Sequence, residues 1–223
     1  MKIAGLMPIG RESKPDFGSL NQLVALCDAV IVLADNVEWS SGLPDEIARL
    51  ARKNEEWNDW TNHLTLLARA AAHGCDWVLL LDDDELLEPS ITRDGLHQQI
   101  EVAVHKGCDL ISYRVREVWS ANPLQYRSDG IWGRKRKVVV HRNPLLGGFV
   151  HWQGNATARL HAQCLPHGKT METECQLLHY GMSTPELRQA RVDKYKQLDP
   201  TNHFNQIGYD YLIDETGMEL TVL

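Results

Sequence analysis

Several features that would place this 223-residue chain in a specialised class are missing from its sequence. Its five cysteines are an odd number spread along the chain, unlike the dense pattern of a small secreted disulfide scaffold, so we expect a reducing compartment. The longest apolar runs, Ala29–Ala34 and Trp77–Leu81, are far shorter than the ~20 residues of a membrane span, and we expect no integral membrane association. The first residues are too polar for a signal peptide, which predicts a cytoplasmic protein.

Positive charge and glycine motifs are scarce as well. The formal net charge is −7 and the pI is about 5.8, which argues against a protein that coats nucleic acid or anionic membrane by bulk electrostatics. No Gly-x-Gly-x-x-Gly follows the first predicted strand, and this disfavours a dinucleotide-dependent oxidoreductase. A chain of this length buries roughly 70% of its unfolded surface, so a metal site would serve function before stability.

The first half of the chain alternates short apolar runs with segments of helical periodicity. Such alternation is typical of βαβ units with a parallel sheet. The runs that predict buried strands are 2–7, 29–34 and 77–81. The segments that predict helices are 20–27, 44–51 with Pro44 in the first turn, 64–71 ended by Gly74, and a helix capped by Ser90 and closed by Gly107.

The second half has a different pattern. Ile111, Tyr113 and Val115 alternate with polar residues, which predicts a strand with one buried face. Segments 137–140 and 176–180 predict further strands, and Thr184-Pro185-Glu186 predicts the start of a last helix that ends near Leu198. The expected fold is α/β, with a mainly parallel sheet, a mixed second half and flanking helices. No linker or repeat interrupts the chain, which favours one domain over residues 1–223.

The sharpest feature is a run of four acids, Asp82-Asp83-Asp84-Glu85, directly behind a predicted buried strand. In extended geometry Asp82 and Asp84 would point to the same side. Ligand sites of open α/β sheets lie at the carboxyl ends of strands, and Mg²⁺ or Mn²⁺ would remove the repulsion between the carboxylates while leaving positions for substrate phosphates. The alternative is a solvated acidic turn before the next helix.

This acidic segment resembles the Asp-x-Asp segment of family 2 glycosyltransferases, which have the GT-A fold. The likeness extends to residue 198: strand 29–34 followed by Asp35 is similar to the nucleotide-binding half, and His179-Tyr180-Gly181 is similar to a segment whose histidine approaches the metal. The resemblance implies a nucleotide-sugar-binding half over 1–107, an acceptor and catalytic half over 108–198, and a C-terminal tail over 199–223.

The resemblance also implies a reaction and a set of site residues. The expected activity is a metal-dependent, inverting transfer of a sugar from a nucleoside diphosphate sugar, with a UDP-sugar favoured. Mn²⁺ or Mg²⁺ would be held by Asp82, Asp84 and His179 and would stabilise the charge that develops on the leaving diphosphate. The residues expected to contact the donor are Pro8, Asp35, Asp82, Asp83, Arg188 and Arg191. Two alternatives stay open: that Asp35 caps a turn, and that His179 is a hydrogen-bonded core histidine.

The catalytic base is less well marked by the sequence. Many relatives carry a glutamate directly after a Val-His pair, whereas in this chain Trp152 and Gln153 follow Val150-His151 and the expected acid is missing. We expect His151 to be the base, with Asp129 and Glu117 as further candidates. A structural role is an equal alternative for each of these residues. Trp132 and Trp152 would stack on a sugar or base, or belong to the core.

Basic residues are concentrated between Lys106 and Arg142, where nine cations face three acids. This stretch is interpreted as a solvated surface, as a group that holds the donor diphosphate, or as a patch for an anionic acceptor. The acceptor is expected to be a saccharide, a protein or a hydroxymethylated DNA base, because some phage transferases that resemble GT-A enzymes modify such bases. A host cell infected by a phage is therefore one expected setting.

Two other interpretations of the sequence stay open, and the first of them uses His179 as well. Cys164, His167, Cys175 and His179 have the composition of a Cys2His2 zinc set, with an interval shorter than in the usual finger, which would indicate a zinc-stabilised binding module. A nucleotidyltransferase would have a similar fold and a glycine-rich first loop, of which Gly10 is a weak sign.

Overall fold

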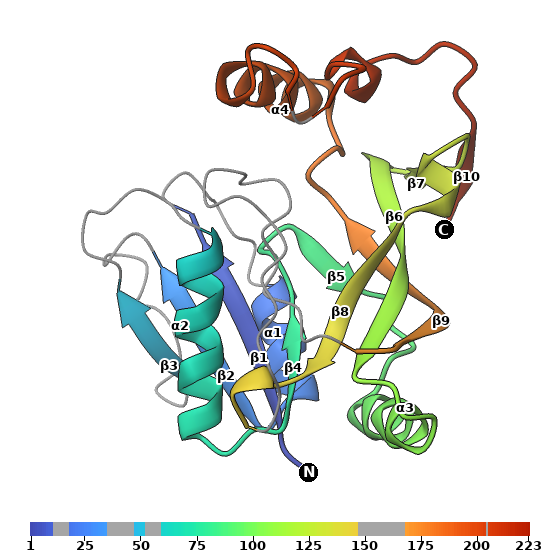
Figure 1. Cartoon of the computed structure of the whole chain (residues 1–223). Helices are drawn as coiled ribbons and strands as arrows, with labels where there is room; N and C mark the ends of the chain where they lie inside the picture. The colour runs from blue at the N-terminus through green and yellow to red at the C-terminus, as the bar shows by residue number, and fades with distance from the viewer. Residues whose placement is uncertain (11–17, 35–46, 52–58, 147–167, 204) are drawn as a thin grey trace. The chain divides into compact units, whose positions relative to one another are not determined.

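The computed structural model describes residues 1–10, 18–34, 47–51, 59–146, 168–203 and 205–223 (Figure 1). Internal contacts divide the chain into two compact units. The first unit comprises Met1–Tyr113 and Lys137–Cys175, and the second comprises Arg114–Arg136 and Gln176–Leu223. The predicted single domain with boundaries at 107 and 198 stays a prediction, because a division by contacts does not test independent folding.

The first unit contains a mainly parallel sheet. Its strands are β1 (Ile3–Ile9), β2 (Ala29–Ala34), β3 (Ile47–Ala51), β4 (Trp77–Leu80) and β8 (Arg136–Arg142, of which Arg136 belongs to the second unit). The order is β8-β4-β1-β2-β3, with β1 to β4 parallel and β8 antiparallel to β4. Ala4 pairs with Ala29 and with Val78, which fixes the register of the three central strands.

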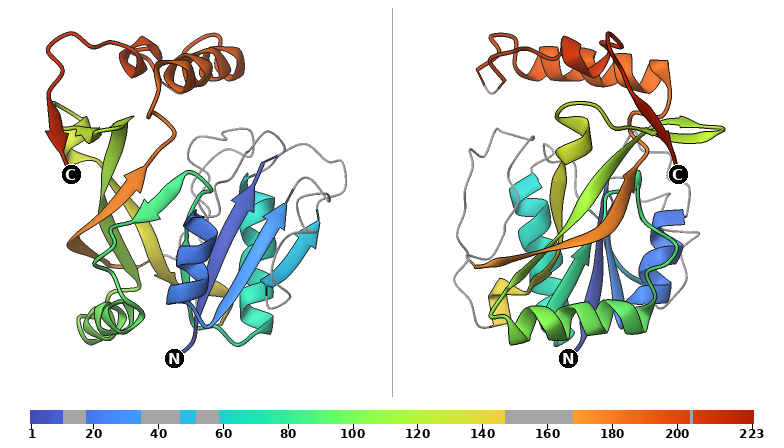
Figure 2. Two further views of the ribbon diagram at one scale, coloured as in Figure 1. Left: turned by 180° about the vertical axis from the view of Figure 1, so that it is seen from behind. Right: turned by 90° about the vertical axis from the view of Figure 1, so that its right-hand side faces the viewer.

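Helices cover both faces of this sheet, which explains why the central strands are apolar on both sides. Figures 1 and 2 show α1 (Gly18–Leu26) and α2 (Asp59–Ala72) on opposite faces. The α2 residues Leu66, Leu67 and Ala70 pack into one core cluster with strand residues such as Leu6 and Ile31. On the other face, a Cβ on Gly5 would lie 3.0 Å from Leu23 Cβ, so the close approach of α1 requires a glycine.

The first unit also contains elements that are not strands of this sheet or the two helices that cover it. They are β5 (Glu85–Leu87), α3 (Arg93–His105), the short 3-10 helix Pro144–Leu146 and most of β9 (Thr170–His179), with β5 paired to β9. The predicted cap Ser90 is wrong: Thr92 is the N-cap, and its hydroxyl accepts a hydrogen bond from Gly95 N at 3.1 Å. Gly107 has a φ of 65°, consistent with the predicted end of the helix.

The prediction of a helix over 44–51 is wrong for its described part. Residues 47–51 form the edge strand β3, in which Val30 pairs with Ile47 and Ala34 with Ala51. The helical spacing rested on three apolar residues in five positions. Such a short segment adopts the conformation that its neighbour stabilises, and β2 offers a full ladder of backbone hydrogen bonds.

The second unit is built on an antiparallel sheet and a helix. Strand β6 (Leu110–Ala121) enters it at Arg114, and the order is β10 (Leu220–Val222), β7 (Leu124–Arg127), β6. Helix α4 (Pro185–Leu198) begins after Thr184, whose hydroxyl accepts a hydrogen bond from Leu187 N, as predicted. Two 3-10 helices, Trp132–Arg134 and Asp210–Leu212, complete the unit.

These elements confirm the predicted α/β class, with a mainly parallel sheet, a mixed second half and flanking helices. Of the helices in the described ranges, none combines the length and the apolarity that a membrane crossing needs.

Candidate active site

The strand order of the first unit creates a position where ligands bind in α/β sheets. The chain runs from β1 through α1 to β2 on one side of β1, whereas β4 returns on the other side after α2. With the two helices on opposite faces, the carboxyl ends of β1 and β4 form the topological switch point, which is where ligands bind in such sheets. The acidic run follows β4 directly, and Pro8 lies near the same end of β1, paired with Leu33 of β2.

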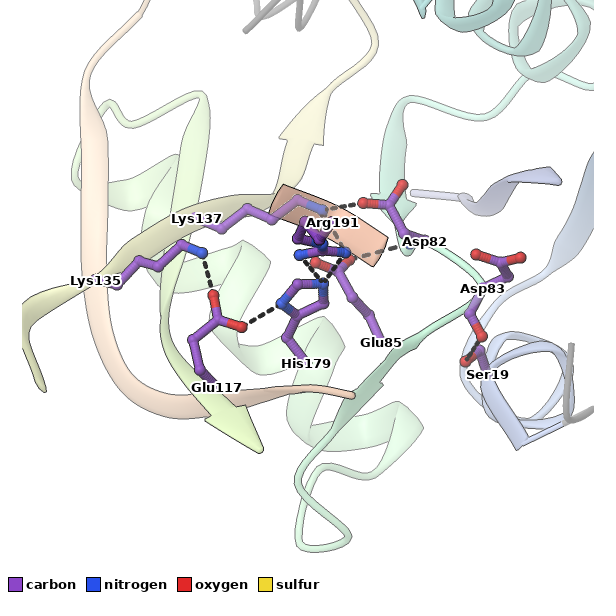
Figure 3. A network of polar contacts seen from close by, with 9 residues as sticks. All are labelled: Ser19, Asp82, Asp83, Glu85, Glu117, Lys135, Lys137, His179 and Arg191. Carbon is purple, nitrogen blue, oxygen red and sulfur yellow. Dashed lines mark hydrogen bonds and ion pairs between the residues drawn. The ribbon is translucent and has the colours of Figure 1, made fainter. Parts of the chain in front are cut away.

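The acidic run is a closed turn and not an extended segment. Glu85 N donates to Asp82 O at 3.1 Å, and Asp82 N donates to the Glu85 carboxylate at 3.0 Å. The expectation that Asp82 and Asp84 project to one side by strand alternation is therefore wrong, because the strand ends at Leu80 and these two bonds fold the chain back. Ser19 of α1 donates to the Asp83 carbonyl at 3.2 Å (Figure 3).

Lys137 of β8 neutralises two of the four acids. Its Nζ lies 2.8 Å from Asp82 Oδ2 and 2.8 and 2.7 Å from the two Glu85 oxygens (Figure 3). The side chains of Lys137 and Glu85 are only 15% and 4% exposed. Burial by itself lowers the pKa of Lys137, but the charges of Asp82 and Glu85 outweigh it and raise that pKa above its ordinary value. This ion pair was not predicted from the sequence.

The described residues contain no group of three His, Cys, Asp or Glu side chains placed to hold a metal ion. The turn nevertheless presents suitable chemistry, because carboxylate oxygens are the ligands of Mg²⁺ and Mn²⁺. Mg²⁺ is commonly held by one or two carboxylates together with substrate phosphates, so a cation that arrives with a nucleotide needs no complete site beforehand. The half-buried Asp84 lies within the turn and is suited to this role.

A second polar cluster lies in the second unit. Glu117 of β6 is 1% exposed, its Oε2 lies 2.5 Å from His179 Nδ1, and its other oxygen pairs with Lys135. Both terminal nitrogens of Arg191 lie 3.4 Å from His179 Nε2 (Figure 3). Burial would raise the pKa of Glu117, but His179 and Lys135 lower it to about 2. Glu117 is thus a weak base with both oxygens engaged.

Asp129 is also held by a neighbouring cation. Arg127 donates to its two oxygens at 2.7 and 3.0 Å, and this hydrogen bonding lowers the pKa of Asp129. Arg127 itself is buried and lies over the rings of Trp119 and Trp132. The predicted stacking residue Trp132 therefore packs inside the second unit, edge-on to Trp119.

Arg188 has the contacts of a structural residue. Its guanidinium donates to Met182 O at 2.9 Å, to Trp119 O at 3.3 Å and to Glu215 at 3.1 Å, and lies 4.2 Å from the Trp119 ring centre. The family resemblance placed Arg188 and Arg191, on the same helix, among the donor-binding residues. Burial separates the two, since Arg188 is buried and Arg191 is half-buried.

Replacing Arg188 should destabilise the second unit. We expect Arg188→Leu to cost about 2–4 kcal/mol of unfolding free energy, because buried carbonyl oxygens lose their donor and the Trp119 ring loses its cation. Urea denaturation followed by tryptophan fluorescence measures this loss. Lys194→Met, at an exposed position of the same helix, should change little. A similarly small loss in Arg188→Leu would contradict the structural role.

Two histidines of the first unit form a buried pair that the sequence did not indicate. The rings of His63 in α2 and His141 in β8 are 5.7 Å apart, and both side chains are buried. The Nε2 atoms of both lack a hydrogen-bond partner within the described ranges, while His141 Nδ1 lies 2.9 Å from Arg142 O. Burial lowers the pKa of His63 to about 3 and that of His141 to about 4.

Several predicted residues lie outside the described ranges. Asp35, the base candidate His151 and Trp152 are among them, as are Cys164 and His167 of the zinc alternative. Cys175 and His179 are both on β9. The zinc set and the assignment of His151 therefore stay predictions.

Comparison with known proteins gives only distant structural likeness. No family model matches the sequence, and no curated protein matches it. Among solved structures, TarS from S. aureus is 12% identical over 88% of this chain with a TM-score of 0.49, and this chain spans 40% of TarS. Rv0371c from Mycobacterium tuberculosis H37Rv is 14% identical with a TM-score of 0.49, covering 88% of this chain and 96% of that one.

A cytidylyltransferase from Leptospira borgpetersenii is 12% identical, with a TM-score of 0.42 and coverage of 78% and 76% of the two chains. Likenesses at this level do not assign an activity.

Proposed function

We propose that this protein is a GT-A type glycosyltransferase that moves a sugar from a nucleoside diphosphate sugar, with a UDP-sugar favoured, to an acceptor hydroxyl. The observation that supports it is the acidic turn Asp82–Glu85 at the carboxyl end of β4, where the strand order changes direction. A diphosphate would be repelled by these carboxylates unless a cation accompanied it. The reaction is therefore proposed to require Mn²⁺ or Mg²⁺.

Asp84 is the proposed ligand of the cation, with Asp82 and His179 as further ligands taken from the family resemblance. When bound, the cation supplies stabilisation for the negative charge on the departing diphosphate. The turn would fix the position of Asp84, because two hydrogen bonds and Lys137 hold its ends together. Pro8, Asp35, Asp83 and Arg191 are the proposed donor contacts, and Arg188 is proposed to support Arg191 through the shared helix.

An inverting transfer needs a base within hydrogen-bond reach of the acceptor hydroxyl. Glu117 and Asp129 are paired with cations and have lowered pKa values, so they attract protons weakly. His151 is therefore the proposed base.

The proposed acceptor is a saccharide, a protein or a hydroxymethylated DNA base. The basic stretch has internal partners for part of its charge: Arg127, Lys135, Lys137 and Arg142 each form an ion pair with a carboxylate. This lowers the charge left for a nucleic acid. Binding of DNA that weakens steeply with salt would support the DNA acceptor over the other two.

The activity is tested by combining binding with product analysis. Thermal unfolding would be followed with UDP, GDP, CMP and dTDP sugars in the presence of Mn²⁺, because a bound ligand raises the unfolding temperature by mass action. The stabilising sugar nucleotide would then be incubated with protein, and the products separated by chromatography. We expect nucleoside diphosphate, formed only with the metal. Release of pyrophosphate from a nucleoside triphosphate would instead establish the nucleotidyltransferase alternative and overturn this proposal.

A further inference from the structure

The acidic turn already contains a cation of the protein's own. Lys137 Nζ contacts three oxygens from two carboxylates, all at 2.7 to 2.8 Å, and all three residues belong to the first unit. The Glu85 carboxylate also contacts the backbone of Asp82, since Asp82 N donates to Glu85 Oε2. An ammonium group at this distance from three oxygens forms charge-assisted hydrogen bonds, which are the strong class.

Burial makes this cation necessary. Glu85 is 4% exposed, and a buried carboxylate without a partner is costly. Lys137 lies on β8, which pairs with β4 at Leu79–Val140, so the sheet brings the ammonium group to the end of β4 where the turn begins. The sheet register, and not the flexibility of a surface side chain, places this charge.

A divalent cation that bound Asp82 or Glu85 would use the same oxygens as Lys137. Mg²⁺ binds oxygen ligands at 2.0–2.1 Å and loses its water reluctantly. It would have to displace the Lys137 ammonium from Asp82 and Glu85 and would then lie beside that positive charge.

We propose that Lys137 is an internal counter-cation that excludes divalent metal ions from Asp82 and Glu85 in the nucleotide-free protein. In that state, metal binding at the turn depends on the remaining carboxylates. This proposal deepens the proposed function, because it adds a residue that controls when the divalent cation binds. It rests on the proposed function only in taking the ligand to be a nucleotide.

Mn²⁺ binding without nucleotide tests the proposal. Free Mn²⁺ would be counted by electron paramagnetic resonance during titration of the wild type, Lys137→Met and Lys137→Arg. We expect Lys137→Met to bind Mn²⁺ about tenfold more tightly or better, because two carboxylates lose their cation. Lys137→Arg keeps the charge and should behave like the wild type. Equal affinity of Lys137→Met and the wild type would overturn the proposal.

Two further variants show which oxygens are involved, and the second of them does not depend on the folding of Lys137→Met. Glu85→Gln in Lys137→Met should remove most of the gained affinity. Glu85→Gln alone should leave Mn²⁺ affinity within about twofold of the wild type, since Lys137 already blocks that carboxylate. A clear loss of affinity in Glu85→Gln alone would mean that the metal uses Glu85 and that the proposal is wrong.

The outcome is independent of the activity. The titrations contain no nucleotide, so a failure of every sugar nucleotide to bind would overturn the proposed transferase and leave the result for Lys137 in place. Conversely, the protein could prove to be a metal-dependent transferase while Lys137→Met binds Mn²⁺ like the wild type. That result would keep the proposed function and overturn the proposed role of Lys137.

Discussion

The protein should lose about 4 kcal/mol of its unfolding free energy between pH 6.5 and pH 4.5, because the buried pair His63 and His141 resists protonation. Their pKa values in the folded chain are about 3 and about 4, against an ordinary value of 6.5. In this pH range the two imidazoles therefore bind protons in the unfolded chain but stay neutral in the folded chain. Stability is fully present above pH 6.5 and falls as the pH drops towards 4.

This loss is a large fraction of the roughly 5–15 kcal/mol that stabilises an ordinary protein, so unfolding should occur near pH 4.5 in mild denaturant. Urea denaturation at pH 7.5, 6.5, 5.5 and 4.5 measures it. The window separates the histidines from Glu117, whose pKa of about 2 means that its contribution is lost only below about pH 4.5.

Single variants identify the source of the acid sensitivity. His63→Leu removes one of the two groups and should reduce the slope between pH 6.5 and pH 4.5 by about half. His105→Gln, at an exposed position of α3, should leave the slope unchanged. An unfolding free energy that stays constant over this range would show that the pair is accessible to protons in the folded protein.

The second large effect concerns Asp84. With a stabilising sugar nucleotide in hand, Asp84→Ala should lower nucleoside diphosphate release by about a hundredfold or more, because charge stabilisation of the leaving group is commonly worth that much. Circular dichroism and the unfolding midpoint should stay near those of the wild type, since Asp84 is half-buried in a turn whose closing hydrogen bonds come from Asp82 and Glu85.

Asp94→Ala is the matched control, because it removes an exposed aspartate of α3. It should keep full activity. Wild-type turnover in Asp84→Ala would exclude this residue as the essential metal ligand, and turnover that is unchanged by chelation of divalent ions would exclude a metal altogether.

The elements that were predicted correctly have clear local sequence signals. Strand β2 ends where Ala34 precedes Asp35, and helix α4 begins at the Thr184-Pro185 signal. In these segments the apolar period and the capping residues agree with the tertiary structure. Where the local signal is short, as in 47–51, the neighbouring strand decides the conformation.

The candidate site was also predicted only in part from the sequence. The sequence alone placed four acids after a buried strand, and it marked Lys137 as part of a basic strand. It did not predict that Lys137 contacts Asp82 and Glu85. These acids lie 55 and 52 positions from Lys137 and reach it only through the pairing of β8 with β4. The alternation argument for Asp82 and Asp84 failed for a related reason, since side-chain hydrogen bonds to the backbone end the strand and close the turn.

By itself, then, the sequence determined an α/β protein with an acidic segment at the end of a central strand, because periodicity and charge order are written along the chain. Only the tertiary structure decided which charges neutralise one another. Glu117 with His179 and Lys135, and Lys137 with Asp82 and Glu85, are pairs set by strand register and burial. Burial gives these pairs their strength, because a charge removed from water must find its partner within the fold.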